Sequence, residues 1–166
     1  MSQKNQNLMQ EYNWQEKHLL ISGFDYETYK DTKQKIRMQL LSDPRFLKPF
    51  RNFIYELSLS YGITHKISFE IKMIVNESIT NIIKHSYNNN PLGWIFFEYL
   101  FYTTYIELRF RDFGKKSFNP KELIPKDLSD FRDKGLGLYI ISKLSDYYYF
   151  KHMEDLGTLL VIKKRI

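Results

Sequence analysis

The chain has 166 residues, of which 43% are hydrophobic and 27% are charged, and this is enough for one globular domain with a buried core. It contains no cysteine, which excludes a disulfide framework and a thiolate metal site. Its net charge is +6. The start lacks an apolar run of signal-peptide length, and the most apolar run, at 94–106, is interrupted by Glu98 and too short to span a bilayer. We therefore expect a cytoplasmic protein without a membrane partner.

A polar arm is predicted at the start of the chain. Residues 1–17 are rich in Gln and Asn and are expected to be mobile or weakly helical, whereas residues 18–166 are expected to form a single domain. A short strand is predicted at 18–24. The charged stretch at 25–43 has only a weak helical pattern, given by its isoleucine and leucine residues.

Two helices are predicted in the middle of the chain. Apolar residues recur at helical spacing over 46–61, with Pro49 placed in the first turn and Gly62 suited to cap the end. The second helix is predicted at 65–86, with Thr64 as its N-terminal cap. Its apolar stripe indicates that one side faces a core.

The second half of the chain is predicted to be rich in strands. The remaining elements are, in order, strands at 93–102 and 104–113, a polar segment at 115–134, a helix at 135–146, and a closing hairpin at 147–153 and 158–166. Successive strands without crossover helices favour antiparallel pairing. The expected fold class is therefore α+β, a two-layer sandwich of a mixed, mostly antiparallel sheet with helices on one face.

Three polar residues form a row on the helix at 65–86. Glu77, Asn81 and His85 follow one another at intervals of four residues, and four residues turn a helix by about 400°. The row therefore runs along one side, at the edge of the apolar stripe, where a sheltered polar site can be built. The alternative is an ordinary solvated helix flank. We expect His85 to be structural rather than catalytic.

Three short motifs accompany this row. RDFG at 111–114 lies at the end of a predicted strand, GLG at 135–137 opens a helix, and GT at 157–158 opens the last strand. Each motif alone is typical of a simple tight turn. A protein-kinase interpretation of DFG fails because the other kinase motifs are missing from the sequence. The order of the motifs, taken together, is much more specific.

The combined pattern resembles the Bergerat-fold (GHKL) ATPase superfamily, which includes gyrase, histidine kinases and MutL. ESITNIIKH (77–85) resembles the N-box of this superfamily, RDFG (111–114) the first glycine box, KGLGLYII (134–141) the second, and LGT (156–158) the last small motif. The resemblance covers about residues 18–166. The Glu-x-x-x-Asn-x-x-x-His form and the compact length are most similar to the bacterial anti-sigma-factor serine-protein kinases of partner-switching systems.

The resemblance implies cofactors and residue roles. ATP and Mg²⁺ are the expected cofactors, with Asn81 as the metal ligand, a hard oxygen suited to a hard ion. Asp112 would accept a hydrogen bond from the adenine amino group, and Glu77 would be the general base that activates a serine hydroxyl or a water. The nucleotide-binding residues that the resemblance implies are Asn81, Asp112, Gly114, Gly135, Leu136, Gly137 and Thr158.

The segment at 115–134 would be the lid over the triphosphate. Arg132 and Lys134 lie near its end, and the alternative for both is a solvated surface position rather than a phosphate contact. Lys116 departs from the family, whose first glycine box usually continues with a second glycine at that position. This difference leaves open whether kinase activity is retained.

The implied function is an ATP-dependent serine-protein kinase and anti-sigma factor, with a sigma factor and an anti-sigma-factor antagonist as its protein partners. The chain has neither a helical hairpin with a phosphoacceptor histidine nor a transducer domain, so we expect a stand-alone domain. The alternative is a nucleotide-gated binding module with little kinase activity. A third hypothesis, nucleic-acid binding, rests only on the positive charge, and we expect no direct nucleic-acid partner.

Aromatic residues alternate along the strand at 94–102 so that both of its faces carry large rings. Helices in a two-layer domain cover only one face, which predicts an exposed apolar patch on the other. We expect a homodimer or a protein partner to cover it, the alternative being that the amino-terminal arm does so.

Overall fold

The structure, a computed structural model, describes residues 33–114, 136–153 and 157–166. The predicted arm and the strand predicted at 18–24 lie outside these residues and stay predictions. In chain order the elements are β1 (Gln34–Leu41), the 3₁₀ turn η2 (Pro44–Phe46), α3 (Leu47–Ser60), α4 (His65–Asn81), the π-helical turn η3 (Ile82–Ser86), β2 (Trp94–Phe101), β3 (Tyr105–Arg111), α5 (Leu136–Leu144), β4 (Tyr147–Met153) and β5 (Gly157–Arg165).

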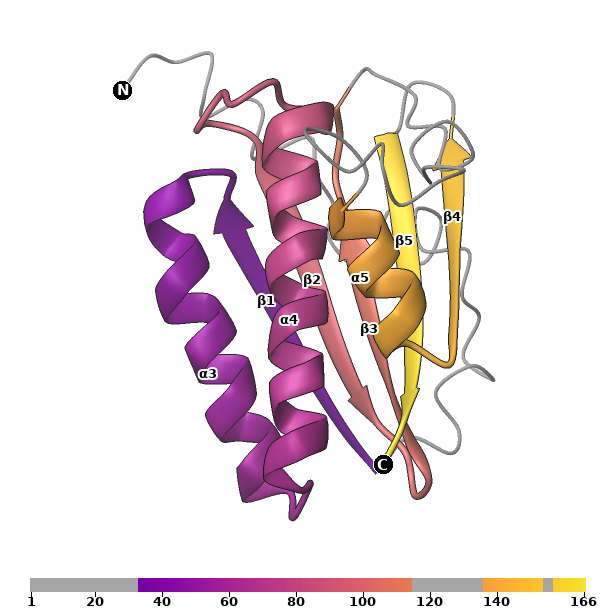
Figure 1. Cartoon of the computed structure of the whole chain (residues 1–166). Coiled ribbons are helices and arrows are strands. Elements are labelled where there is room, and N and C mark those ends of the chain that lie inside the picture. Colours follow the sequence, from indigo (N-terminus) through magenta and orange to yellow (C-terminus); the bar gives the residue numbers. More distant parts are fainter. Residues whose placement is uncertain (1–32, 115–135, 154–156) are drawn as a thin grey trace. The chain divides into compact units, whose positions relative to one another are not determined.

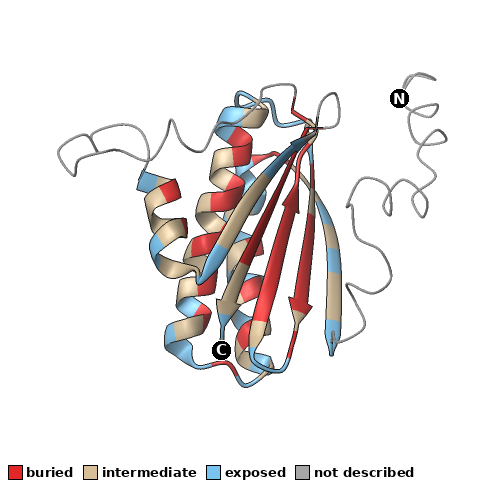
Figure 2. Ribbon diagram, turned by 90° about the vertical axis from the view of Figure 1, so that its right-hand side faces the viewer, coloured by how far each residue is buried: buried red, intermediate tan, exposed pale blue. Residues whose placement is uncertain are grey.

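The five strands form one sheet in the order β1-β2-β3-β5-β4, and every neighbouring pair is antiparallel. Helices α3, α4 and α5 cover one face of this sheet (Figure 1). Buried residues concentrate in the central strands and on the sides of the helices that face them (Figure 2). The predicted α+β fold with helices on one face is confirmed, and its sheet is antiparallel throughout the described strands.

The two central helices follow the predicted pattern. Helix α3 contains Pro49 in its first turn, and Gly62 follows its end with a φ of +77°, which suits glycine. Thr64 caps α4, because its Oγ1 accepts a hydrogen bond from the Ile67 N–H at 3.4 Å. The predicted stripe of α4 faces the core, and Ile71 and the other inward residues are almost completely buried.

Strand β1 corrects the weak helical pattern expected at 25–43. Ile36, Met38 and Leu40 alternate along it and pack against the core, which is the two-residue period of a strand. Its eight residues pair with all eight of β2. The stretch was ambiguous in the sequence because two of its apolar residues, Ile36 and Leu40, are separated by four positions, a spacing that satisfies both periods.

The second face of the sheet carries charged residues beside the predicted apolar ones. Phe97, Tyr99 and Phe101 of β2 all belong to the core side. The opposite side carries Glu98, which ion-pairs with cations on β1 and β3. The same side also carries Leu100 of β2 and Tyr102 just after it, which are 0% and 7% exposed, so this face combines charged and apolar residues. The homodimer or protein partner expected on it stays a prediction.

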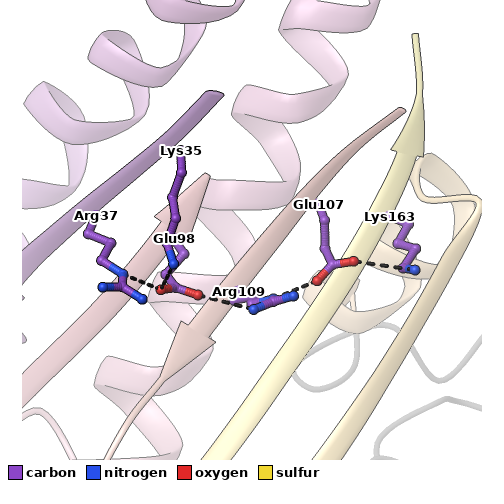
Figure 3. Close-up of polar contacts among 6 residues, drawn as sticks. All are labelled: Lys35, Arg37, Glu98, Glu107, Arg109 and Lys163. Carbon is purple, nitrogen blue, oxygen red and sulfur yellow. Dashed lines mark hydrogen bonds and ion pairs between the residues drawn. The ribbon is translucent and has the colours of Figure 1, made fainter. Parts of the chain in front are cut away.

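Figure 3 shows this ion network, whose residues belong to β1, β2, β3 and β5. Its members are Lys35, Arg37, Glu98, Arg109, Glu107 and Lys163. Arg109, at its centre, is only 2% exposed and contacts both Glu98 and Glu107. Burial favours a raised pKa for Glu98, yet the charges of Lys35 and the two arginines outweigh burial and hold the pKa below its ordinary value. The attraction between these paired charges offsets the cost of removing them from water, a cost that a single unpaired charge would carry without compensation.

Candidate functional site

Glu77 and Asn81 lie one turn apart near the end of α4, and α5 begins beside them. A Cβ atom on Gly137 would lie 2.7 Å from Glu77 Oε2 and 3.2 Å from Asn81 Oδ1. The absence of a side chain at Gly137 therefore lets the first turn of α5 come close to both polar groups. The N-terminus of a helix carries partial positive charge, which favours a carboxylate or a phosphate nearby.

Asp112 and Thr158 lie at the adjoining edge of the sheet. Their backbones exchange two hydrogen bonds, Asp112 N–H to Thr158 O at 3.0 Å and Thr158 N–H to Asp112 O at 3.2 Å, which extend the pairing of β3 with β5. Both residues are buried, with 3% and 4% of their surface exposed. The Thr158 hydroxyl also lies 3.3 Å from His152 Nδ1.

The Asp112 carboxylate is held in a defined orientation. Its Oδ1 accepts a hydrogen bond from the Gly114 N–H at 2.9 Å. Burial raises the pKa of the Asp112 carboxyl, although the Gly114 N–H and the Ser86 hydroxyl oppose this rise by hydrogen bonding. An ionised carboxylate has about four acceptor positions. Asp112 therefore keeps capacity to accept a hydrogen bond from a ligand amino group.

Two glycines permit this close packing. A Cβ on Gly114 would collide with the backbone of Ser86, and a Cβ on Gly157 would collide with the backbone carbonyl of Asp112. Gly157 also has a φ of +81°, in a region that other residues rarely adopt. Both glycines thus support the conformation of the Asp112 segment.

The turn η3 and the residue after it connect the α4 site residues Glu77 and Asn81 with the segment that contains Asp112. Asn81 ends α4, and the chain continues as a π-helical turn to Ser86. The Tyr87 hydroxyl then donates to Trp94 O at 2.6 Å and accepts from the Phe113 N–H at 2.9 Å. Burial raises the pKa of Tyr87 to about 12, which extends to more alkaline pH the range in which the phenol can donate.

The structure thus brings Glu77, Asn81 and Gly137 together, and it separately joins Asp112, Gly114 and Thr158. Leu136 opens α5 and is 53% exposed. His85 is exposed on η3, and its structural role stays a prediction. Gly135, Lys116, Arg132 and Lys134 lie outside the described residues, so their predicted roles are untested.

Sequence reasoning missed several residues that contact the motifs. Ser86 and Tyr87 follow the polar row directly, but nothing in their spacing indicated that they would contact the segment 112–114. Asn76 precedes Glu77 and donates a hydrogen bond to it, although neighbouring helix residues point in different directions. The only feature of the sequence that could have indicated Asn76, Ser86 and Tyr87 is that they directly flank the motif at 77–85.

A magnesium ion would find few protein ligands here. Within the described ranges there is no group of three or more His, Asp or Glu side chains able to hold a metal. Asn81 Oδ1 faces the space that Gly137 leaves open, and Mg²⁺ is commonly held by one or two protein oxygens together with substrate phosphates and water. The residues present therefore fit a metal that arrives with a nucleotide.

Comparison with known proteins identifies the family. The histidine kinase-like ATPase domain matches residues 40–164, which is most of the chain and spans all of the motifs described above. The chain belongs to the histidine kinase-like ATPase family. The superfamily resemblance drawn from the sequence motifs is thereby confirmed.

Curated proteins named as serine-protein kinases or as an anti-sigma factor are similar to this chain in sequence. The chain is 29% identical over 143 residues to the serine-protein kinase RsbW of Listeria monocytogenes serotype 4a, covering 80% of this chain and 90% of the relative. It is 25% identical over 157 residues to RsbW of Oceanobacillus iheyensis, with 88% and 90% covered. It is also 30% identical over 100 residues to the anti-sigma F factor of Geobacillus thermodenitrificans, with 58% and 68% covered.

Solved structures share the fold of the histidine kinase-like ATPase domain. The structure of the RsbU and RsbW domains of Rv1364c from Mycobacterium tuberculosis matches with a TM-score of 0.59 and 16% identity over 80% of this chain, which spans 32% of that longer chain. A chain of the SiaB–SiaC complex from Pseudomonas aeruginosa matches with a TM-score of 0.55 and 12% identity, with 92% and 99% covered. Among the described residues, no helix has the length and apolar character to cross a membrane.

Proposed function

We propose that this protein is an ATP-dependent serine-protein kinase and anti-sigma factor that binds a sigma factor and phosphorylates an anti-sigma-factor antagonist. The observation that carries the proposal is the convergence of Glu77 and Asn81 on the first turn of α5 at Gly137. This combines a carboxylate, a hard oxygen ligand and a helix N-terminus, the groups that phosphoryl transfer requires.

The nucleotide would bind along the adjoining edges of α4, α5 and β3. Asp112 accepts a hydrogen bond from the adenine amino group, and its burial excludes competing water. Thr158 lies beside Asp112 and contributes to the adenine site, while Gly114 holds the carboxylate. Backbone N–H groups at Gly135, Leu136 and Gly137 bind phosphate oxygens at the start of α5.

Asn81 would hold Mg²⁺ through Oδ1, with phosphate oxygens and water completing the coordination. The ion supplies charge neutralisation for the phosphates when it is bound. Asn81 also fixes where the triphosphate lies relative to Glu77, because the two residues are one helical turn apart.

Glu77 would act as the general base. As the serine oxygen forms its bond to the γ-phosphorus, the bond from that phosphorus to the β–γ bridging oxygen breaks and ADP leaves. The Glu77 carboxylate accepts the serine proton and later releases it to solvent. Proton transfer of this kind contributes about 10²–10⁴-fold to a rate.

The proposed partners are supported by the similarity to proteins named as serine-protein kinases and as an anti-sigma factor. We further propose that the protein is a homodimer that acts in the cytoplasm. A nucleotide-gated binding module is the second candidate, because Lys116 stands where the family usually has a second glycine of its first glycine box. In that case ATP would control partner binding without phosphate transfer.

Calorimetry and a transfer assay test this proposal together. Mg·ATP should bind and Mg·GTP should bind much more weakly, and γ-labelled ATP should phosphorylate a purified cognate antagonist on serine. Binding of ATP without transfer to any candidate antagonist would favour the binding module. Absence of heat with ATP, or a preference for GTP, would overturn the site assignment.

A further inference from the structure

A chain of hydrogen bonds links α3 to the proposed base. The Arg51 guanidinium donates through Nη1 to Asn76 Oδ1 at 2.6 Å, and Asn76 Nδ2 donates to Glu77 Oε1 at 2.9 Å. Arg51 and Asn76 are 25 positions apart in the sequence, so the packing of α3 on α4 creates this contact. The three residues form a continuous relay from one helix to the candidate site.

The chemistry of the relay permits only one orientation of the Asn76 amide. A guanidinium can only donate, and an ionised carboxylate can only accept. The amide must therefore present its oxygen to Arg51 and its nitrogen to Glu77. The orientation of Asn76 is fixed by its two neighbours.

One carboxylate oxygen of Glu77 accepts the hydrogen bond of the relay, and the other oxygen points toward the candidate site. Oε1 accepts from Asn76, whereas Oε2 faces Gly137, where an added Cβ would lie 2.7 Å away. Binding one oxygen fixes the rotation of the carboxylate. The free oxygen is the one placed to accept a proton from a hydroxyl at the phosphate end.

Arg51 is held in this place at a cost in stability. Its Nε is buried and lacks a hydrogen-bond partner within the described part of the chain. An unsatisfied buried donor destabilises a fold. The contact that the guanidinium does make is the hydrogen bond from Nη1 to Asn76, next to the candidate site.

We propose that Arg51 and Asn76 are positioning residues that orient the Glu77 carboxylate for proton acceptance. This inference rests on the proposed function of Glu77 as the general base. Neither residue needs to contact ATP. Loss of either should therefore lower the rate of phosphate transfer while ATP affinity is retained.

Steady-state kinetics with Mg·ATP and a purified antagonist test the relay. Arg51→Met and Asn76→Ala should each lower kcat about tenfold, because small misplacements of a catalytic group are costly, with KM for ATP within about twofold. The double variant should be no slower than Asn76→Ala, since the two residues act through one contact. Arg51→Lys keeps a donor and should recover part of the rate, and Lys48→Met, at an exposed position of α3, is the matched control.

Additive losses in the double variant, unchanged kcat in both single variants, or a collapse of ATP affinity would each overturn the relay. A readout without catalysis is the side-chain amide signal of Asn76 in ¹⁵N-edited NMR spectra of the nucleotide-free protein. It should shift in Arg51→Met and in Glu77→Gln but stay in place in Lys48→Met. No shift in either of the first two variants contradicts the relay whatever the kinetics show.

The two measurements separate the failure of this inference from that of the proposed function. A wild-type protein that transfers no phosphate overturns the role of Glu77 and the positioning role with it. If the Asn76 amide signal still shifts in Arg51→Met and Glu77→Gln, the hydrogen bonds of the relay exist and it is the proposed kinase activity that fails. Normal transfer in the wild type, in Arg51→Met, in Asn76→Ala and in the double variant would leave the kinase assignment intact and remove the relay alone.

Discussion

The two ends of the candidate nucleotide site are built by different means. At the phosphate end, Glu77 and Asn81 are half-buried and are positioned by two helices that meet at Gly137. At the adenine end, Asp112 and Thr158 are almost fully buried and are positioned by paired strands. Under the proposed function, the sheet would hold the group that recognises adenine in a buried, hydrogen-bonded place, and the helices would hold groups that remain accessible to a second reactant.

The largest expected effect comes from the phosphate end. Glu77→Gln keeps the size of the side chain but cannot accept a proton, so phosphate transfer should fall by about 100-fold or more. ATP affinity measured by calorimetry should stay within a few-fold of the wild type. Glu56→Gln, an exposed carboxylate on α3, is the control. Loss of ATP binding in Glu77→Gln would show that Glu77 is needed for binding, so that phosphate transfer and ATP binding do not depend on different residues.

Gly137→Ala tests the space between the helices. The added methyl group would lie 2.7 Å from Glu77 Oε2, so either α5 or the carboxylate must move, and a misplacement of about 1 Å can cost roughly 100-fold in rate. We expect transfer to fall by 10- to 100-fold on this basis, with a smaller loss of ATP affinity. Leu136→Ala changes an exposed neighbour and should have a minor effect. Wild-type kinetics in Gly137→Ala would contradict the proposed geometry.

Asp112→Asn tests the adenine end. Hydrogen bonds to charged groups contribute about 1.5–3 kcal/mol, so ATP affinity should fall by about tenfold or more. The rate at saturating ATP should change little, the reverse of the pattern for Glu77→Gln. Calorimetry with ATP and GTP measures the change, and an undiminished preference for ATP would remove Asp112 from adenine recognition.

The effect of burial on Asp112 can be measured without a ligand, from the pH dependence of the free energy of unfolding. Its pKa is raised by burial above the ordinary value of 3.8, so the folded state holds the proton more tightly than the unfolded state does. The contribution to the free energy of unfolding is therefore fully present below pH 3.8 and is lost as pH rises through the raised pKa. Chemical denaturation of the wild type relative to Asp112→Asn should show this loss.

ATP affinity should change in the opposite direction over the same pH range, because only the ionised carboxylate is the strong acceptor that the adenine amino group requires. Stability and affinity curves that move together would contradict this assignment. The comparison with Asp112→Asn is needed because other carboxylates titrate in the same range.

The smallest expected effect is that of Tyr87→Phe. This change removes the hydroxyl that joins the Trp94 carbonyl to the Phe113 N–H and keeps the ring. A typical hydrogen bond contributes about 1 kcal/mol, so ATP affinity should fall only a few-fold. Tyr55→Phe, which removes a hydroxyl contact to His65 on the surface, is the control. Equal behaviour of the two variants in calorimetry would show that Tyr87 does not support the adenine end.

Most of the fold could be predicted because its periodic patterns are strong. The stripe of α4 and the aromatic strands β2 and β3 were predicted close to their observed bounds. Strand β1 could not be, since its spacing suited both a helix and a strand. The charged second face was missed because Glu98 was considered only as an interruption of an apolar run.

The site was predictable only where its chemistry follows a motif. Glu77, Asn81 and Asp112 stand in recognisable local patterns. Arg51 and Tyr87 do not, because their contacts join residues 25 and 26 positions apart and depend on how helices and loops pack. Local spacing carries no information about such contacts.

The ion network on the second face also has a consequence for folding. Glu98 lies directly opposite both Arg37 and Arg109, and Glu107 lies opposite Lys163. A one-residue slip of any of these strands would turn its side chains to the other face, so that charges would enter the apolar layer and aromatic rings would leave it. One set of charges therefore favours the observed register in three strand pairings, and a sheet with a shifted register would bury unpaired charges.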